Sequence, residues 1–303
     1  MERFDAVVIG GGPAGLSAAL VLSRARRKVV VLDHGKYRNA CSHGLHGYLT
    51  RDGIEPSEFL RLAREEIAHY SVPILAAEAN DVLKNEDFEV HAALLESGTE
   101  ITIHARLLLI ATGLRDRLPE IEGMRDVYGT SAHHCPHCDG WEWRDQSIAI
   151  LAHGPSAFNL STELLNWSRD LVLCTNGRSK QVPSVGIPVI TKRIVKLEQE
   201  DGFLRKIWFH DGTGIERRAL FFVAPQEPSC NIARTLGCTV FRKGLVRTDG
   251  KQRTNVGGLY VAGDAMRDVH FAILAAAEGA RAAIAMNAEL TRSHRPHPDP
   301  GVR

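Results

Sequence analysis

The sequence predicts an α/β protein with two doubly wound, three-layer domains, and three observations support this class. Residues 5–33 have the order strand, glycine-rich turn, helix, strand; residues 148–174 repeat that order; and residues 107–111 form a fully apolar run. An apolar run without alternation is typical of a parallel strand that is covered on both faces. Each repeat therefore predicts one domain built around a parallel sheet.

Length and composition limit the possible functions. The 303 residues are 44% hydrophobic and 24% charged, which suits two packed domains. A formal net charge of +1 gives no field that attracts nucleic acid or an acidic membrane surface. The chain runs from Met1 directly into a strand, and charged residues interrupt each apolar run before ~20 residues. We therefore expect a cytoplasmic protein that binds neither nucleic acid nor membrane.

The first glycine-rich turn lies between a strand over 5–9 and a helix over 16–26. The next strand, 28–32, ends in Asp33, which is 23 positions after Gly10. Glycines let the backbone approach a pyrophosphate and let the helix pack on the strand, and the helix N-terminus supplies amide donors. An acid at this spacing accepts hydrogen bonds from a ribose. The candidate dinucleotide-binding residues are Gly10, Gly12, Pro13, Ala14, Gly15 and Asp33.

A polar segment that is rich in glycine and histidine follows over 35–58. This composition predicts a loop, and Pro56 is placed to begin a helix that ends near Tyr70. We expect the loop to cross a binding cleft. Its candidate cofactor contacts are Arg38, Asn39 and His46.

Short strands are expected next over 82–83, 88–94 and 100–105, before the apolar strand 107–111. Ligands of such sheets bind beyond the carboxyl ends of parallel strands. We therefore expect the turn Thr112-Gly113, directly after the apolar strand, to meet the cofactor.

The second repeat has a strand over 148–151, a helix that ends near Trp167 and a strand over 171–174. Near the C-terminus, a strand ends in Gly263-Asp264 and an alanine-rich helix follows over 272–289. The tail 293–303 has three prolines and two histidines, and it is expected to be disordered.

Six cysteines in 303 residues are too sparse for a disulfide scaffold, and only Cys135 and Cys138 have a chemically meaningful spacing. A thiolate is the attacking species, and neighbouring imidazoles and a helix N-terminus lower the pKa of a thiol. His134 and His137 are such neighbours. Of the four remaining cysteines, Cys174, Cys230 and Cys238 are expected in the core.

A zinc site is the competing interpretation of this pair, because His133, His134 and His137 lie beside it. A structural zinc site needs four ligands at closed spacing, and the sequence offers no second CxxC and no spaced histidine pair. We therefore expect a redox dithiol and no metal.

Four motifs in order resemble the low-molecular-weight thioredoxin reductase family of flavoproteins, over nearly the whole chain. They are the first glycine-rich turn, Ala111-Thr112-Gly113, Cys135-x-x-Cys138-Asp139-Gly140 and Ala262-Gly263-Asp264. The resemblance implies two Rossmann-like domains and a homodimer. It implies an FAD-binding domain over 1–116 and 245–303, with an NAD(P)-type domain inserted over 117–244 that carries the dithiol.

The resemblance also implies roles for single residues. Asp33 would bind the adenosine ribose, and Asp264 would bind the ribityl or phosphate part of FAD. Cys138 would exchange electrons with the flavin, Cys135 would react with the substrate sulfur, and Asp139 would manage the thiol proton with His134 nearby. His270-Phe271-Ala272 stands where relatives have Arg-Gln-Ala at the flavin ring, so Phe271 and Ala272 are expected to contact it.

The second turn departs from the pattern of an NADPH-using relative. It reads Ala152-His153-Gly154-Pro155-Ser156-Ala157, and Thr175-Asn176-Gly177 replaces the usual basic cluster. A 2′-phosphate needs a cation, preferably a guanidinium. NADPH binding is therefore doubtful, unless Arg178 and Lys180 supply the charge or NADH is used instead.

Cys-Pro-His-Cys and the 38–53 loop resemble the gliotoxin-type dithiol oxidases of this scaffold more than ordinary reductases. The resemblance implies oxidation of a small dithiol by the Cys135–Cys138 disulfide, with electrons passing to FAD and then to oxygen. The alternatives are an NAD(P)H-dependent thioredoxin reductase that acts on a thioredoxin-like protein, a ferredoxin-linked enzyme, and a flavin-binding redox sensor. The sequence does not identify the substrate.

Overall fold

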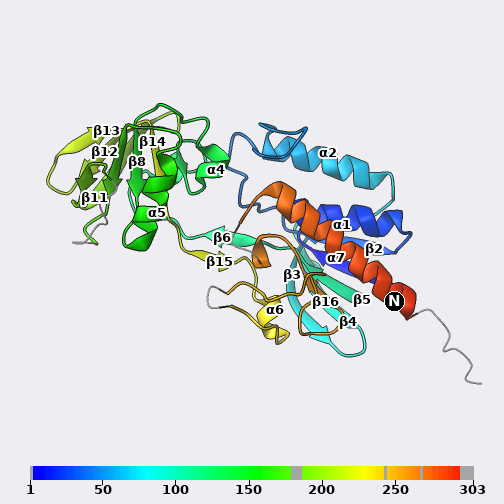
Figure 1. Cartoon of the computed structure of the whole chain (residues 1–303). Helices are drawn as coiled ribbons and strands as arrows, with labels where there is room; N and C mark the ends of the chain where they lie inside the picture. Colours follow the sequence, from blue (N-terminus) through cyan, green and yellow to red (C-terminus); the bar gives the residue numbers. More distant parts are fainter. Residues whose placement is uncertain (1–2, 179–185, 242–243, 267–268, 294–303) are drawn as a thin grey trace, which may run out of the picture. The chain divides into compact units, whose positions relative to one another are not determined.

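The computed structural model describes residues 3–178, 186–241, 244–266 and 269–293 (Figure 1). They form two compact units. Unit 1 comprises residues 1–38, 57–115 and 227–303, and unit 2 comprises residues 39–56 and 116–226. Two positions named above, Lys180 and the tail from 294 to 303, lie outside the described residues.

The centre of unit 1 is a parallel sheet whose strands are paired in the order β3, β2, β1, β5, β16. Each of these strands is rich in Val, Leu or Ile, and β2 is buried along its whole length. A strand β4 (Phe88–Leu94) pairs antiparallel with both β3 and β5. The strands of the parallel sheet are β1 (Arg3–Ile9), β2 (Val29–Asp33), β3 (Ile74–Lys84), β5 (Glu100–Ile110) and β16 (Leu259–Val261).

The expected separate strands over 100–105 and 107–111 are one continuous strand, β5. Its first half pairs with β4, for example Phe88 with Ala105, and its second half pairs with β1, for example Val7 with Leu108. Arg106 does not interrupt the strand, because its backbone continues the ladder while its side chain reaches polar partners.

One face of this sheet is covered by helices α1 (Pro13–Arg24), α2 (Pro56–Ala68) and α7 (Ala272–Arg292), and α1 and α7 lie side by side (Figure 1). The two helices approach closely because Gly279 has no side chain. A Cβ there would lie 1.9 Å from the carbonyl oxygen of Ala14. The opposite face packs against the antiparallel part of the sheet and the short helix α6 (Ile232–Thr235). The expected three-layer arrangement is confirmed, with an antiparallel layer on one side.

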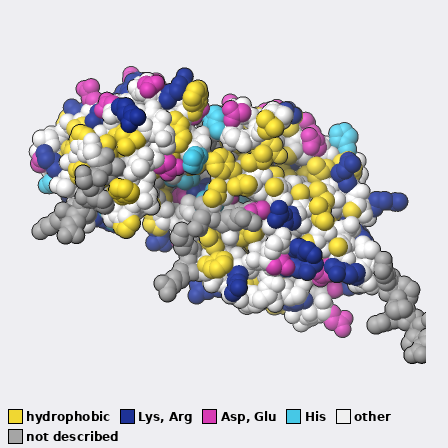
Figure 2. Space-filling model, viewed as in Figure 1, with side chains coloured by type: hydrophobic (Ala, Val, Ile, Leu, Met, Phe, Trp, Pro, Cys, Tyr) yellow, Lys and Arg dark blue, Asp and Glu magenta, His cyan; other side chains and the backbone are white. Residues whose placement is uncertain are grey.

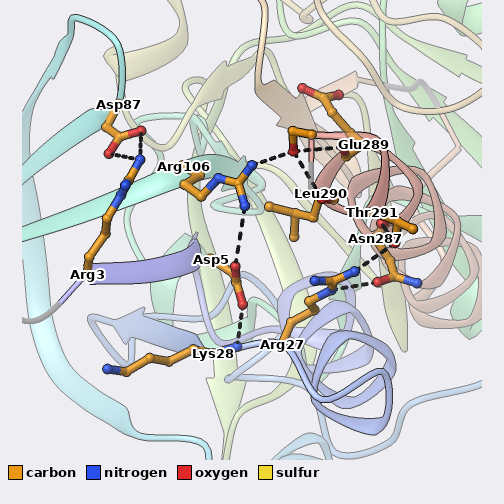
Figure 3. A network of polar contacts seen from close by, with 11 residues as sticks. Arg3, Asp5, Arg27, Lys28, Asp87, Arg106, Asn287, Glu289, Leu290 and Thr291 are labelled. Carbon is orange, nitrogen blue, oxygen red and sulfur yellow. Dashed lines mark hydrogen bonds and ion pairs between the residues drawn. The ribbon is translucent and has the colours of Figure 1, made fainter. Parts of the chain in front are cut away.

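Polar contacts hold the ends of these elements together (Figure 3). Arg27 donates to Asn287 and Thr291 of α7, at 2.7 Å in each case. Arg106 donates to Ser293 at the end of α7 and also faces Asp5 of β1. The C-terminal helix is thereby tied to the first strand and to the end of α1.

Unit 2 repeats this design. Its five-stranded sheet is entirely parallel, with order β10, β9, β8, β14, β7. Helix α5 (Pro155–Leu164) packs on one face and a three-stranded antiparallel sheet packs on the other. The parallel strands are β7 (Ala132–His133), β8 (Ile148–Leu151), β9 (Leu171–Cys174), β10 (Val189–Ile190) and β14 (Ala219–Phe222). The antiparallel strands are β11 (Ile194–Glu200), β12 (Phe203–Phe209) and β13 (Gly214–Glu216), and α3 (Met124–Val127) precedes β7.

The chain passes between the units at β6 (Leu114–Asp116) and β15 (Gln226–Pro228), which pair as a two-stranded sheet. The units divide the chain differently from the expected domains at two places. Residues 227–244 group with unit 1, where Ile232 and Cys238 join its core. Residues 39–56 group with unit 2, where Cys41 packs against Gly129.

Within the described part of the chain, no helix is both long enough and apolar enough to cross a membrane.

Candidate functional site

The dithiol lies directly after the carboxyl end of β7, an edge strand of the unit 2 sheet. Cys135 caps the short helix α4 (Pro136–Asp139), and its carbonyl oxygen accepts hydrogen bonds from the N–H groups of Cys138 and Asp139 at 3.1 and 3.2 Å. This turn brings the two sulfur atoms together as a disulfide, with Cα atoms 5.3 Å apart. Both cysteines are partly exposed, so a substrate thiol can reach them.

His137 lies between the two cysteines, and Gly140 follows Asp139. Both are held by neighbours in unit 2. His137 Nε2 lies 2.9 Å from Glu163 Oε1 of α5, and its ring stacks edge-on against Trp167 at 5.8 Å. A Cβ on Gly140 would lie 2.5 Å from the Pro136 carbonyl oxygen, so only glycine fits after Asp139 here. These contacts fix the dithiol turn on α5.

The histidines around the dithiol have separate surroundings. The ring of His134 lies 6.4 Å from Tyr128, whereas His133 is buried and lies beside Asp139 and Trp143. Within the described ranges, no three His, Cys, Asp or Glu side chains are grouped so that they could hold a metal ion. The sequence named His133 only as a possible zinc ligand and gave no sign of Trp143.

The first glycine-rich turn of unit 1 has the close contacts that its glycines predict. Gly10 has φ +111°, and a Cβ there would lie 2.4 Å from the Ala111 carbonyl oxygen. A Cβ on Gly15 would lie 1.9 Å from the Gly10 carbonyl oxygen, so the helix begins directly against the strand. Gly12 caps α1 without a side-chain hydrogen bond, and a Cβ on it would meet no atom within 4 Å. The first N–H groups of α1 therefore begin at Ala14, because Pro13 has none, and a helix N-terminus of this kind suits a pyrophosphate.

Asp33 ends β2 beside this turn and has partners that the sequence did not indicate. Its carboxylate accepts hydrogen bonds from Tyr37, from the Gly35 amide at 3.1 Å and from Arg64 at 2.7 Å. Burial by itself would raise the pKa of Asp33, but these hydrogen bonds and the Arg64 charge outweigh it and lower the pKa. The carboxylate is therefore fixed in its ionised form at the edge of the sheet, next to Gly11.

The remaining unit 1 candidates gather at the same edge. Arg38 Nη1 lies 3.2 Å from Asp264 Oδ2. Gly263 has φ +79°, its amide donates to Glu278 of α7 at 2.9 Å, and a Cβ on it would lie 3.1 Å from Ala14.

Thr112, Gly113, Phe271 and Ala272 complete the set on unit 1. The amide of Thr112 lies 3.1 Å from where a Gly10 Cβ would be, and a Cβ on Gly113 would lie 4.0 Å from Asp264. Phe271 caps α7 and Ala272 begins it. The glycine turn, the carboxylate after β2 and the turns after β5 and β16 therefore meet at the carboxyl ends of neighbouring parallel strands, which is where a dinucleotide binds.

Asn39 and His46 belong to unit 2, where they have contacts of their own. His46 lies between two carboxylates, 3.6 Å from Asp52 and 3.7 Å from Glu142. The Asn39 carbonyl oxygen accepts the Ser42 amide in a local turn. Their expected contacts with a cofactor stay predictions.

The second turn, on unit 2, differs from the first in backbone geometry. Ala152 is buried and lacks the positive φ of Gly10. Gly154 has φ +60° and caps α5, which begins at Pro155. After β9, the Asn176 side chain accepts the Ile194 amide at 2.8 Å and so anchors the loop to β11. That position is the one at which NADPH-using relatives were expected to present basic side chains.

The four other cysteines are free thiols, and Cys41 is exposed. Cys174 and Cys238 are buried as expected, and burial raises the pKa of Cys174 to about 12. Cys230 is only partly buried, and its sulfur lies 3.4 Å from the Thr112 hydroxyl in the turn after β5.

A CxxC disulfide on one doubly wound unit and a dinucleotide-type turn on another define a flavin-dependent disulfide oxidoreductase. Residues 4–279 match the family model of pyridine nucleotide-disulphide oxidoreductases, and the chain belongs to that family. The expected class of enzyme is thereby confirmed.

Individual relatives agree with this assignment. Thioredoxin reductase aclD of Aspergillus oryzae is 30% identical, and the alignment covers 95% of this chain and 96% of the relative. The crystal structure of HlmI is 34% identical with a TM-score of 0.88, covering 96% of this chain and 93% of the other. An oxidoreductase from Agrobacterium tumefaciens is 30% identical with a TM-score of 0.86, and the match covers 96% of this chain and 99% of the other. The chain is thus a thioredoxin reductase-like disulfide oxidoreductase.

Proposed function

We propose that the protein is an FAD-dependent dithiol oxidase that forms a disulfide in a small substrate. The observation that carries the proposal is the second turn. Ala152 replaces the glycine with positive φ, and the Asn176 side chain is committed to the Ile194 amide. Of the described residues 175–178 that follow β9, only Arg178 carries a guanidinium group, whereas an adenosine 2′-phosphate is best bound by several charge-assisted, bidentate donors.

In the proposed reaction, one thiolate of the substrate attacks the Cys135 sulfur. The Cys135–Cys138 bond breaks, and its electron pair stays on Cys138. The second substrate thiol loses its proton and attacks the first substrate sulfur, which releases Cys135 as a thiolate. The products are the substrate disulfide, the reduced Cys135 and Cys138 pair, and two protons.

The residues at the carboxyl edge of the unit 1 sheet fit FAD. The α1 amides after Gly12 would hold its pyrophosphate, Asp33 its adenosine ribose, and Asp264 with Arg38 its ribityl or phosphate part. Bound FAD would accept the two electrons of the reduced cysteine pair and deliver them to oxygen, giving hydrogen peroxide.

Anaerobic mixing with NADPH or NADH tests the electron donor directly. We expect the flavin absorbance to persist with either nucleotide and to bleach with a small dithiol such as dithiothreitol. In air, the dithiol should be consumed with one peroxide formed per substrate disulfide. Rapid bleaching by NADPH would contradict the proposal and identify a reductase.

An NAD(P)H-dependent thioredoxin reductase is the second candidate, and the names of its relatives favour it. It would run the exchange in the opposite direction, from the nicotinamide through the flavin to a protein disulfide. Reduction of insulin by NADPH in the presence of thioredoxin is the assay that would support it.

We further propose a homodimer. Figure 2 shows hydrophobic side chains gathered on the face of unit 1 that carries α1 and α7. Three large ones on α7 are exposed, namely Ile273 at 36%, Leu274 at 39% and Ile284 at 64%. A patch of this kind on the exposed side of an alanine-rich helix supports a protein interface.

A further inference from the structure

A buried histidine lies beside the dithiol turn. His133 is the last residue of β7, and its backbone is paired with Phe221 of β14. Only 6% of its side chain is exposed, and its ring packs against Phe221 at 5.5 Å and Trp143 at 6.0 Å. A buried polar ring of this kind must find partners for both nitrogens.

The first partner fixes the position of the ring proton. Trp143 Nε1 donates a hydrogen bond to His133 Nε2 at 2.9 Å. An indole nitrogen can only donate, so Nε2 must offer its lone pair and the single ring proton must be on Nδ1. Trp143 thus selects one of the two tautomers of His133.

The second partner is the carboxylate next to the redox pair. His133 Nδ1 lies 3.3 Å from Asp139 Oδ1, and Asp139 follows Cys138 directly. The tautomer that Trp143 selects places the ring proton on Nδ1, the nitrogen that lies 3.3 Å from Asp139 Oδ1. Among the described residues, no other side chain forms an ion pair or hydrogen bond with this carboxylate. Its other oxygen therefore remains available to exchange a proton with a thiol.

We propose that Trp143 and His133 are positioning residues that hold Asp139 as the proton carrier of the thiol exchange. The carboxylate takes the proton of the second substrate thiol when that thiol attacks, and the resulting carboxylic acid gives the same proton to a cysteine thiolate. His133 keeps its own proton throughout, so charge and atoms balance on Asp139 and the two sulfurs. This inference rests on the proposed dithiol exchange at Cys135 and Cys138.

The tautomer can be tested without measuring activity. In purified, flavin-loaded protein with ¹⁵N-labelled histidine, we expect the His133 Nδ1 resonance to be that of a protonated nitrogen and the Nε2 resonance to be that of an unprotonated one. Trp143→Phe removes the donor and keeps an aromatic ring, and it should abolish this preference. A wild-type His133 with its proton on Nε2 would overturn the proposal.

Two substitutions of His133 separate its two contacts. His133→Asn places an amide donor where Nδ1 was and keeps the contact with Asp139, whereas His133→Gln extends toward Trp143 and loses Asp139. We would measure anaerobic exchange of the Cys135–Cys138 disulfide with dithiothreitol, by acid quench, alkylation and mass spectrometry. Exchange should be slowed by about tenfold or more in His133→Gln, and much less in His133→Asn. The loss of the whole ~10²–10⁴ that a positioned acid or base supplies is the upper limit.

A matched control is Trp208→Phe, which also removes one indole hydrogen bond, from Trp208 to Glu198 in the antiparallel sheet of unit 2. It should leave the exchange rate unchanged. Equal rates for the Asn and Gln variants, whether both slow or both normal, would refute the relay. Failure of the wild-type protein to exchange with dithiothreitol at all would instead refute the proposed function, while the tautomer measurement would still stand.

Discussion

Arg38 Nη1 lies 3.2 Å from Asp264 Oδ2, and the two side chains are only 12% and 23% exposed. The contact joins the segment after β2 to the turn after β16, two regions 226 positions apart in the chain. An arginine this close to a partly buried carboxylate offsets its charge where a phosphate-bearing cofactor is proposed to bind.

Arg38→Met keeps much of the apolar stem and removes the guanidinium. We expect the protein to fold and to lose FAD affinity by about tenfold or more, because Asp264 then faces the phosphates uncompensated. The ratio of flavin to protein absorbance after dialysis measures this. Arg61→Met, on the exposed face of α2, is the control and should retain flavin.

Gly279→Ala tests the close approach of α7 to α1. The added methyl would lie 1.9 Å from the Ala14 carbonyl oxygen, so the helices must separate. We expect a loss of about 1–3 kcal/mol or more in the free energy of unfolding, measured by urea denaturation, together with weaker flavin retention. Gly257→Ala, where a Cβ meets nothing within 4 Å, should change neither quantity.

The Asp33 carboxylate should make the free energy of unfolding depend on pH. Its folded-state pKa is lowered, so its contribution is complete above the unfolded-state value of about 3.9 and is lost as the pH falls through the lower folded-state pKa. Asp33→Asn should therefore cost stability at neutral pH, and the difference from the wild-type protein should shrink below about pH 4. Unfolding midpoints across this range measure it, with Asp126→Asn, an exposed carboxylate of α3, as the charge control. A difference that grows toward acid would contradict the assignment.

The two dithiol cysteines should behave differently when replaced singly. Cys138→Ser leaves Cys135 able to form a mixed disulfide that no partner sulfur can release, so an adduct should accumulate with an aromatic disulfide reagent. Cys135→Ser lacks the sulfur that is proposed to face the substrate, so that adduct should not accumulate. Both should lack turnover, and peptide mapping by mass spectrometry distinguishes an adduct on the dithiol turn from one on the exposed thiol of Cys41. An adduct only on Cys135→Ser protein would reverse the proposed roles.

Ile284→Glu tests the homodimer. The wild-type protein should have the mass of two chains in light scattering, and the variant should have the mass of one, because a charge in an apolar interface is costly. Leu49→Glu, at a still more exposed apolar residue of unit 2, is the control and should remain dimeric.

The parts of the fold that follow from local pattern could be predicted from the sequence. This holds for the strands 148–151 and 171–174 and for the first glycine-rich turn. A buried strand requires apolar residues and a close backbone contact requires glycine, so both can be recognised from residue type. The continuity of β5 could not be predicted, because its second half pairs with β1, which is remote in sequence.

The side-chain partners of the candidate residues could not be predicted from the sequence either. Asp33 was expected from its spacing, but nothing in the sequence connects it to Arg64, 31 positions away. Trp143 and His133 meet because β7 and the turn after α4 lie next to each other in space. Such pairs are properties of the tertiary packing, and a single sequence gives no signal for them.

The continuous strand β5 couples the antiparallel layer to the parallel sheet of unit 1. Its first residues belong to the antiparallel layer and its last ones to the sheet that carries the glycine turn, with Ala105 paired to Phe88 and also beside β1. Fraying of the antiparallel layer therefore propagates along one backbone toward Ala111 and Gly10. Amide hydrogens in both layers should exchange as one cooperative unit, with a single opening free energy.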